Sequence, residues 1–348
     1  MGAEERDQGL TGKRHTLLTA TVAEFIATAQ PVGSQQVAGR HNIGIKSAMA
    51  RNVMAELEEL GYLLQPHTSA GRVPTDKAFR YYVDHLADST RIAFRDRTRI
   101  ELHYSERGRD LLTLMRDTPR LLSLLTGQAA IVMSPRLETV EIEHVNFVRL
   151  RESEVLALFV TKAATVQNRV VTSERDHSQD ELDRMARYLN ESLHGRTLDQ
   201  ARRWIESQLR EERARYDSFM REALEFGDAV TGHIEGSELY VEGSVKALEQ
   251  PEFSDPERVK DLLRALEDKT ALLQLLERSL EQHSLTVSIG SENISPKLAT
   301  FSIVAAPYTG GAKPPGSVAV VGPVRMDYER VIPLVDYTAK ALSRVLGQ

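Results

Sequence analysis

Arg51 and Asn52 are adjacent residues whose side chains can read DNA bases. An arginine guanidinium can bond O6 and N7 of guanine, and an asparagine amide can bond N6 and N7 of adenine. The pair follows the small residues Ser47 and Ala48 near the start of a helical pattern, and the N-terminal part of a recognition helix is the part that reaches base edges in the major groove. The pair therefore predicts contact with duplex DNA, although any exposed helix face can carry such residues.

The helix that carries this pair has an apolar face on its other side. That face is formed, at spacings of four, four and three residues, by Met49, Val53, Leu57 and Leu60. Such spacing is typical of a helix that packs one side against a core. We therefore expect the pair to face solvent.

The flanking segments have the order of a winged helix-turn-helix. Apolar periodicity predicts two earlier helices, Pro31-Val-Gly33 separates them, and a tight basic hairpin follows Gly61 as the wing. The expected elements are a helix over 14–29, a short helix from Ser34, the helix with Arg51, strands over 62–64 and 72–74, and a helix from Thr75 to Asp88.

Candidate DNA contacts come from the second helix, the recognition helix and the wing. They are Ser34, Gln35, Gln36, Lys46, Ser47, Ala48, Arg51, Asn52, His67, Thr68, Ser69 and Arg72. The wing residues could instead serve turn chemistry alone, with Gly71 needed for the turn. Lys46 opposes the helix dipole but lies where free backbone N–H groups attract phosphate, so a phosphate contact competes with a merely solvated lysine.

The composition fits a soluble protein of two or three domains. The 348 residues are 41% hydrophobic and 27% charged. No cysteine is present, which excludes disulfides, zinc fingers and thiol nucleophiles. The charged start of the chain is unlike a signal peptide, and no apolar run reaches the ~20 residues of a membrane span.

The net charge of −6 does not favour DNA binding. The predicted DNA-binding part is not basic either, because residues 1–90 hold nine basic and ten acidic side chains. DNA affinity depends on local charge instead. A basic cluster is expected around the recognition helix and wing from Arg40, Lys46, Arg51, Arg72, Lys77 and Arg80. So few cations bind DNA weakly from one copy, which favours a dimer.

Strands on both sides of a helical block predict one α/β domain with an insertion, because late strands need a sheet to join. One antiparallel sheet is expected from short runs between 129 and 174, joined by late strands near 286–289, 299–305, 317–321 and 324–326. The Gly- and Pro-rich segment 307–316 is expected as a surface loop or a ligand lid. A heptad-like helix over 255–282 favours core packing over a coiled coil.

Catalytic and metal-binding signatures are not found. No P-loop, nucleophile elbow or H-E-x-x-H pattern occurs, and the ten histidines lack metal-ligand spacing. We expect no enzymatic activity, no cofactor and no metal.

Several motifs resemble the HrcA heat-shock repressor family. They are PVGS at Pro31, Arg51-Asn52, ELEELGYL at Glu56, QPHTSAGRVPTDKAFRYYVD at Gln65, VSIGSEN at Val287 and RMDYERVIPLVDYTAKAL at Arg325. The chain departs from the family pattern Ser-x-Ala-Thr-Ile-Arg-Asn with Lys46-Ser-Ala-Met49-Ala50-Arg-Asn, which we interpret as repacking by two inward residues and loss of an N-cap serine.

The resemblance implies an α+β multidomain fold with an N-terminal winged helix-turn-helix and a GAF-like α/β domain interrupted by a mainly helical dimerisation insert. The expected boundaries are 1–90 for DNA binding, 91–110 for a linker helix, 111–195 and 256–348 for the GAF-like domain, and 196–255 for the insert. Dimerisation is expected at an apolar stripe of Leu209, Tyr216, Phe219 and Met220, although aromatic residues here could equally be buried within the insert.

The resemblance also implies the function. Family members are dimeric repressors of chaperone genes that bind an inverted-repeat operator, with the GroEL chaperonin modulating their activity. We expect a cytoplasmic, nucleoid-associated repressor of this kind. A winged-helix regulator whose GAF-like domain senses a small molecule is the alternative, and a winged helix that contacts only protein or RNA is a third class.

Overall fold

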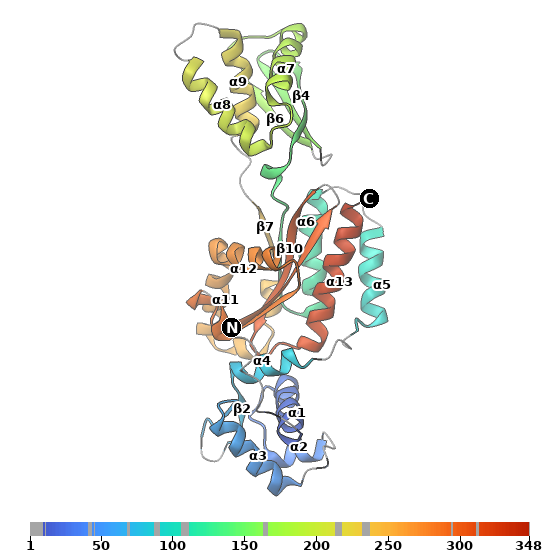
Figure 1. Ribbon diagram of the computed structural model, residues 1–348, viewed down its shortest axis with the longest axis vertical. Coiled ribbons are helices and arrows are strands. Elements are labelled where there is room, and N and C mark those ends of the chain that lie inside the picture. The colour runs from blue at the N-terminus through green and yellow to red at the C-terminus, as the bar shows by residue number, and fades with distance from the viewer. Residues whose placement is uncertain are drawn as a thin grey trace. The chain divides into compact units, whose positions relative to one another are not determined.

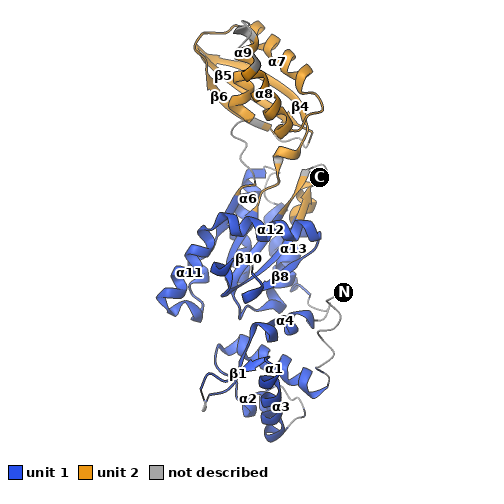
Figure 2. Ribbon diagram, turned by 60° about the vertical axis from the view of Figure 1, so that its left-hand side comes forward, with its two compact units in different colours: residues 1–132, 239–307, 317–341 blue, residues 133–238, 308–316, 342–348 orange. Residues whose placement is uncertain are grey.

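The computed structural model describes residues 10, 12–40, 44, 46–67, 70–86, 91–105, 111–162, 166–212, 218–231, 237–293, 295–310 and 313–347. The chain divides into two compact units, shown in Figure 2. One comprises residues 1–132, 239–307 and 317–341, and the other comprises residues 133–238, 308–316 and 342–348.

The first unit begins with the predicted winged helix-turn-helix, which we call the reading head (Figure 1). Its elements are α1 (Lys13–Thr28), α2 (Ser34–Arg40), α3 (Ser47–Glu59), β1 (Leu63–Leu64), β2 (Val73–Pro74) and α4 (Asp76–Asp84). β1 and β2 pair antiparallel as the wing. Thr75 caps α4 by accepting a hydrogen bond from the Ala78 backbone N–H, as a threonine N-cap does.

A close backbone approach ties the wing to the turn between α1 and α2. Val32 and Arg72 exchange two backbone hydrogen bonds of 2.8 Å. Gly71 lies against this bridge, and a Cβ there would lie 2.6 Å from the carbonyl carbon and oxygen of Val32. Gly71 is therefore required by contact with Val32, in addition to the turn chemistry that we expected.

Gly71→Ala is expected to destabilise the reading head by roughly 1–3 kcal/mol, since backbone must shift to admit the methyl group. Gly39→Ala in α2 meets nothing within 4 Å and is expected to stabilise by roughly 0.5–1 kcal/mol, because alanine loses less conformational entropy in a helix. Native-state hydrogen exchange of amides in α1–α3 measures both changes. Equal protection in the two variants would contradict this account of Gly71.

The GAF-like part of the first unit is built on a five-stranded sheet of order β7-β3-β10-β9-β8. Its strands are β3 (Ala129–Met133), β7 (Leu239–Glu242), β8 (Thr286–Ile289), β9 (Phe301–Gly310) and β10 (Lys313–Pro323). Helices α5 (Phe94–Ser105), α6 (Leu111–Thr126) and α13 (Tyr328–Leu346) lie side by side next to the sheet (Figure 1). Hydrogen bonds link Tyr104 to Thr118 and Tyr337 to Glu101 across these helices.

Three expectations for this part need correction. The segment 307–316 is no loop or lid along its length, because β9 continues to Gly310 and β10 starts at Lys313. The strand that we expected over 324–326 is not formed, because β10 ends at Pro323 and these residues make the turn that leads into α13. The helix expected over 255–282 is two helices, α11 (Pro256–Glu267) and α12 (Lys269–Gln282). Asp268 separates them because its side chain caps α12 at the Ala271 N–H. The short elements that precede α11 are α10 (Ser244–Ala247) and a 3-10 turn over Pro251–Ser254.

The second unit has its own core, in which a three-stranded antiparallel sheet packs against three helices. The strands are β4 (Ile142–Arg151), β5 (Glu154–Thr161) and β6 (Val166–Thr172), and the helices are α7 (Gln179–Leu193), α8 (Leu198–Glu212) and α9 (Ser218–Thr231). Its buried apolar side chains form one cluster, with members from Ile142 in β4 to Val230 in α9. We expected these strands and α7 in the GAF-like domain, with the insert starting at residue 196. The packing instead changes near residue 133, so β3 alone of the early strands joins the GAF-like sheet.

One edge of this sheet is closed by two amide side chains of α7. The Asn190 amide accepts from the Val145 N–H at 2.7 Å and donates to the Val145 carbonyl at 2.8 Å. The Gln179 amide accepts from the Arg149 N–H and donates to the Phe147 carbonyl. These bonds occupy the outward backbone groups of β4 that would otherwise template another strand.

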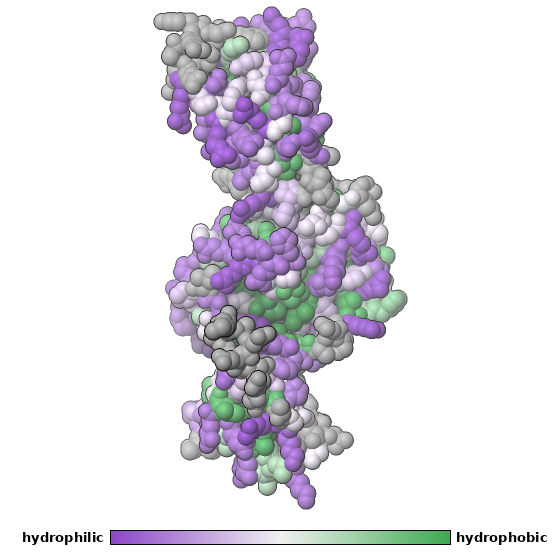
Figure 3. Space-filling view, viewed as in Figure 1, coloured by the Kyte–Doolittle hydropathy of each residue, from purple (hydrophilic) through white to green (hydrophobic). Residues whose placement is uncertain are grey.

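The face of this sheet that points away from the helices carries two apolar rows, separated by a row in which Asn146 and Asn168 flank Leu158. Val148, Leu156 and Val170 stand in one cross-strand row, and Val160 pairs with Val166 in another. Val166 and Val170 are each 51% exposed. We call this surface, formed by Val148, Leu150, Leu156, Leu158, Val160, Val166 and Val170, the open sheet face. By contrast, the outer surface of α7 and α8 is largely hydrophilic (Figure 3).

Candidate nucleic-acid interface

The reading head presents Arg51 and Asn52 to solvent from the N-terminal half of α3. Both side chains are exposed, and Ala48 and Ala55 extend the same stripe by one turn in either direction. Small neighbours leave room for a base edge, and a guanidinium next to a carboxamide offers the two bidentate contacts that distinguish guanine and adenine. The pair therefore faces solvent as we expected, and direct base readout stays a prediction.

The buried face of α3 differs from the expected one by a rotation of about one residue. Its core residues are Ala50, Val53, Met54 and Leu57, with Ala50 and Leu57 fully buried. Met49 and Leu60 are each 43% exposed, so the inference that Met49 faces inward is wrong. The small Ala50 side chain lets α3 pack closely on α1 and α2, and hydropathy alone ranks methionine above alanine for that position.

Lys46 is the N-cap of α3, with extended backbone and no side-chain cap hydrogen bond. Lysine has no acceptor atom, so the first N–H groups of α3 are left open to an anion. Lys46 is exposed, whereas Ser47 is half-buried. This arrangement agrees with a phosphate contact at the start of α3, which stays a prediction.

Lys46→Ser is expected to stabilise α3 by about 1 kcal/mol, because serine can accept from the first-turn N–H groups. It should also lower the slope of log K against log salt by about 0.9, the loss of one phosphate contact. Lys260→Ser, at an exposed lysine of α11, is the control and should leave the slope unchanged. Salt titrations of DNA binding by the two variants decide the matter, and equal slopes would remove Lys46 from the phosphate surface.

The acidic C-terminal half of α3 is paired with cations of its own module. Glu56 binds Arg14 at 2.8 Å, and Glu58 binds Arg72 at 2.9 Å. These pairs reduce the repulsion that phosphate would otherwise meet there. They also decide the position of Arg72, whose side chain is only 18% exposed and points to α3. A phosphate contact by Arg72, the wing residue that we favoured, would require its pair with Glu58 to open.

Three further cations of the expected basic cluster have structural partners. Arg40 binds Glu24, Lys77 donates to the Leu60 carbonyl at the end of α3, and Arg80 binds Glu292. Among the described residues, Lys46 and Arg51 have no ion-pair partner. The basic surface is therefore smaller than the sequence indicates.

The remaining predicted contacts divide into exposed and engaged residues. Gln35 and His67 are exposed, and Ser34 is half-buried. Gln36 donates to Glu24 at 2.6 Å and so faces α1. Thr68 and Ser69 lie outside the described residues.

Sequence reasoning missed Glu24 and Lys13. Glu24 is buried in α1 and accepts from both Gln36 and Arg40, which holds α2 in place. Lys13 lies beside Met49 on the exposed side of α3, with its ammonium 3.4 Å from the thioether sulfur. A buried glutamate that needs partners gives no signal in the periodicity, whereas the Lys13 contact depends on how α1 meets α3.

The expected dimerisation stripe is only partly described. Leu209 packs against the core of the second unit, and Met220 is half-buried. Tyr216 and the side chain of Phe219 lie outside the described residues. Within the part of the chain that the structure describes, no group of three metal-ligating side chains occurs, and no helix is long and apolar enough to cross a membrane.

Comparison with known proteins gives full-length matches. The family described as "HrcA protein C terminal domain" matches residues 113–332. The chain is 42% identical to the heat-inducible transcription repressor HrcA of Geobacter sulfurreducens, over 97% of this chain and 98% of that protein. It is 37% identical to the protein of the same name from Syntrophobacter fumaroxidans, again over 97% and 98%.

A solved structure described as "Crystal structure of a hypothetical protein at 2.2 A resolution" has a TM-score of 0.70 at 27% identity, over 97% of this chain and 99% of that chain. The wing, the exposed Arg51-Asn52 pair and the GAF-like sheet define a winged-helix transcription regulator. By its relatives over nearly its full length, the chain belongs to the HrcA family of heat-inducible transcription repressors.

Proposed function

We propose that this protein represses chaperone genes by binding an inverted-repeat operator as a dimer and blocking transcription. The observation that carries the proposal is the exposed Arg51-Asn52 pair on the N-terminal half of α3. We infer the link to heat from the names of the relatives, which are called heat-inducible transcription repressors. A role in transcription implies action in the cytoplasm, at the nucleoid.

Dimerisation is part of the proposal because the reading head alone has few available cations. Two linked heads gain affinity through effective concentration, by a factor of roughly 10²–10⁴ over one head. An inverted repeat is read by two recognition helices about one helical turn, ~34–36 Å, or a multiple of it apart. A two-fold dimer supplies that symmetry.

We place the dimer contact on the open sheet face of the second unit rather than on the stripe from Leu209 to Met220. The open sheet face carries the apolar row Val148, Leu156 and Val170, and the next row, Asn146, Leu158 and Asn168, is polar but also uncharged. A second copy can therefore meet this face without like-charge repulsion. The bonds from Asn190 and Gln179 to the edge of β4 disfavour association by strand addition at that edge. Contact of face with face is therefore the arrangement that we propose, and the helical stripe is the alternative.

We also propose, from the family resemblance alone, that the GroEL chaperonin modulates the activity of this repressor. The alternative of a small-molecule sensor receives less support, because the segment 307–316 that suggested a ligand lid is largely strand.

Capture of genomic fragments by the purified full-length protein, followed by sequencing, tests the proposal. The expected product is a set of fragments that share one inverted repeat located upstream of chaperone genes. Fragments without a shared repeat would contradict sequence-specific repression, and a repeat upstream of unrelated genes would leave the regulator but remove the chaperone assignment.

A further inference from the structure

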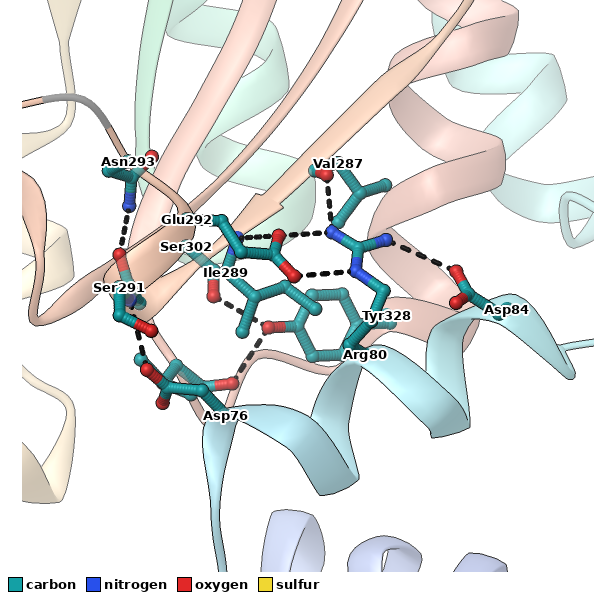
Figure 4. A network of polar contacts seen from close by, with 12 residues as sticks. Asp76, Arg80, Asp84, Val287, Ile289, Ser291, Glu292, Asn293, Ser302 and Tyr328 are labelled. Atoms are coloured by element: carbon teal, nitrogen blue, oxygen red, sulfur yellow. Dashed lines mark hydrogen bonds and ion pairs between the residues drawn. The ribbon is translucent and has the colours of Figure 1, made fainter. Parts of the chain in front are cut away.

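Two motifs of the GAF-like part are not explained by DNA contact: VSIGSEN at residues 287–293 and RMDYERV at residues 325–331. Both gather against the reading head (Figure 4). The first includes β8 and the turn after it, and the second leads into α13. The element that they contact is α4, which directly follows the wing.

Arg80 of α4 is the centre of this contact. Its guanidinium donates from Nε to Glu292 at 2.8 Å and from Nη2 to the second oxygen of the same carboxylate. The same Nη2 donates to the Val287 carbonyl at 2.6 Å, and Nη1 donates to Asp84 at 3.2 Å. A bidentate arginine–carboxylate pair fixes direction as well as distance. Glu292 therefore sets the orientation of α4 relative to β8.

A second contact lies one turn earlier on α4. The Asp76 carboxylate accepts from the Ser291 backbone N–H at 2.9 Å. Gly290, next to it, has a φ of +52°, and a Cβ at this position would collide with the Asp76 carboxylate. The glycine is thus needed both for its backbone conformation and for the close approach of this turn to α4.

The second motif supplies further contacts to the reading head. Tyr82 of α4 donates to Glu329 at 2.7 Å, and burial raises the pKa of this phenol so that it remains a donor. Arg325 donates to the Ile26 carbonyl near the end of α1 and binds Glu252. Phe79 meets Tyr328 at a ring-centroid distance of 6.3 Å.

The reading head also has packing contacts of its own. Phe79, which also meets Tyr328, contacts Phe25 of α1, and Tyr81 contacts Tyr62 beside the wing. Glu292 touches only Arg80 among the residues of the reading head for which bonds are described. The Arg80 side chain also stays 30% exposed, so water can reach this joint and compete for its bonds.

We propose that Arg80 and Glu292 are positioning residues that fix the angle at which the GAF-like part carries α3. We call the set Asp76, Arg80, Ser291 and Glu292 the clasp. The inference rests on the proposed function, because two α3 helices read two half-sites only when their separation matches the operator. The clasp then determines which half-site spacing the dimer accepts, while the residues of α3 determine which bases it accepts.

The test uses full-length Glu292→Gln with a series of inverted repeats that differ only in the spacing of their half-sites. In this variant the orientation of α3 that fits the natural spacing is expected in about one molecule in ten, and affinity for the natural spacing then falls about tenfold. Affinities for the other spacings should approach the affinity for the natural spacing. The plot of affinity against half-site spacing, the spacing profile, should therefore be flatter than in the wild type. Affinity for a single half-site should change by less than about twofold. The charge-exchanged variant R80E/E292R should recover part of the wild-type profile.

Glu257→Gln, which removes the same charge at an exposed pair of α11, should keep the wild-type profile. A wild-type profile in Glu292→Gln would overturn the inference. An equal loss on the half-site would also overturn it, because the contact would then support the fold of the reading head.

A readout without DNA separates this inference from the proposed function. The chain has no cysteine, so Ala55→Cys on α3 and Leu263→Cys on α11 can carry one spin label each, both at exposed positions. The distance distribution between the labels should be narrow in the wild type and broad in Glu292→Gln. Equal widths would overturn the positioning role of the clasp even if the protein binds DNA as proposed. A broadened distribution in a protein that binds no duplex would leave the positioning role and contradict only the proposed operator binding.

Discussion

Val170→Glu is expected to give a folded monomer that has lost most of its affinity for the full inverted repeat. The side chain lies on the edge strand β6, in the row that it shares with Val148 and Leu156 of the open sheet face. It is 51% exposed in one copy, so the charge is tolerated there. In a face-to-face dimer the same carboxylate would be buried opposite apolar side chains without a partner, which is strongly unfavourable. Loss of the second head should lower affinity for the repeat by roughly 10²–10⁴, with half-site binding retained.

Sedimentation and repeat binding measure this result together. Ser207→Glu, at an exposed position of α8, is the matched control and should stay dimeric. A double variant of the helical stripe, Tyr216→Glu with Phe219→Glu, tests the alternative. A dimeric Val170→Glu beside a monomeric stripe variant would move the interface to the helices.

Arg51→Ala and Asn52→Ala should each remove specific binding while leaving non-specific binding largely intact. Each bidentate base contact accounts for roughly 1–3 kcal/mol of discrimination, or about 5- to 150-fold in affinity. Both side chains are exposed, so the fold should not change.

Parallel titrations on the selected repeat and on random duplex measure the two kinds of binding. Glu59→Ala, an exposed position at the far end of α3, should alter neither. Equal losses on both duplexes would assign Arg51 and Asn52 to phosphate contacts instead.

The winged helix could be predicted from sequence because its signals are local. Helical periodicity, the Thr75 cap and the basic hairpin are each contained within a few residues. The same locality explains the error at Met49. Whether residue 49 or 50 faces the core depends on how closely α3 approaches α1 and α2, and that distance is set by tertiary packing.

Sheet membership could not be predicted, because strand order depends on pairings between segments far apart in the chain. The runs at β3 and β4 lie within ten residues of each other in the chain, yet β3 pairs with strands more than a hundred residues away while β4 pairs with β5. The sequence pattern identified β3, β4, β5, β6 and the late strands β8, β9 and β10, placed a further strand over 324–326 that is not formed, and gave no information on which strands pair.

The ion pairs were the least predictable part of the candidate site. Arg72 lies in the wing and Arg80 lies in the helix that follows it. From sequence, both were counted in the basic cluster around the recognition helix and the wing. Their carboxylate partners Glu58 and Glu292 lie 14 and 212 residues away, the second in another part of the fold. A count of local charge cannot distinguish a cation that is free for DNA from one that holds two elements together.

The specificity ratio of the full-length dimer tests the central claim most directly. The affinity for its selected inverted repeat is divided by the affinity for a scrambled duplex of equal length and composition, at about 0.15 M salt, since ratios depend on salt. The account predicts a ratio of about 10³ or more, as for specific operator binding. A ratio close to one would show that the exposed residues of α3 do not read bases, and would contradict the assignment of this protein as a sequence-specific repressor.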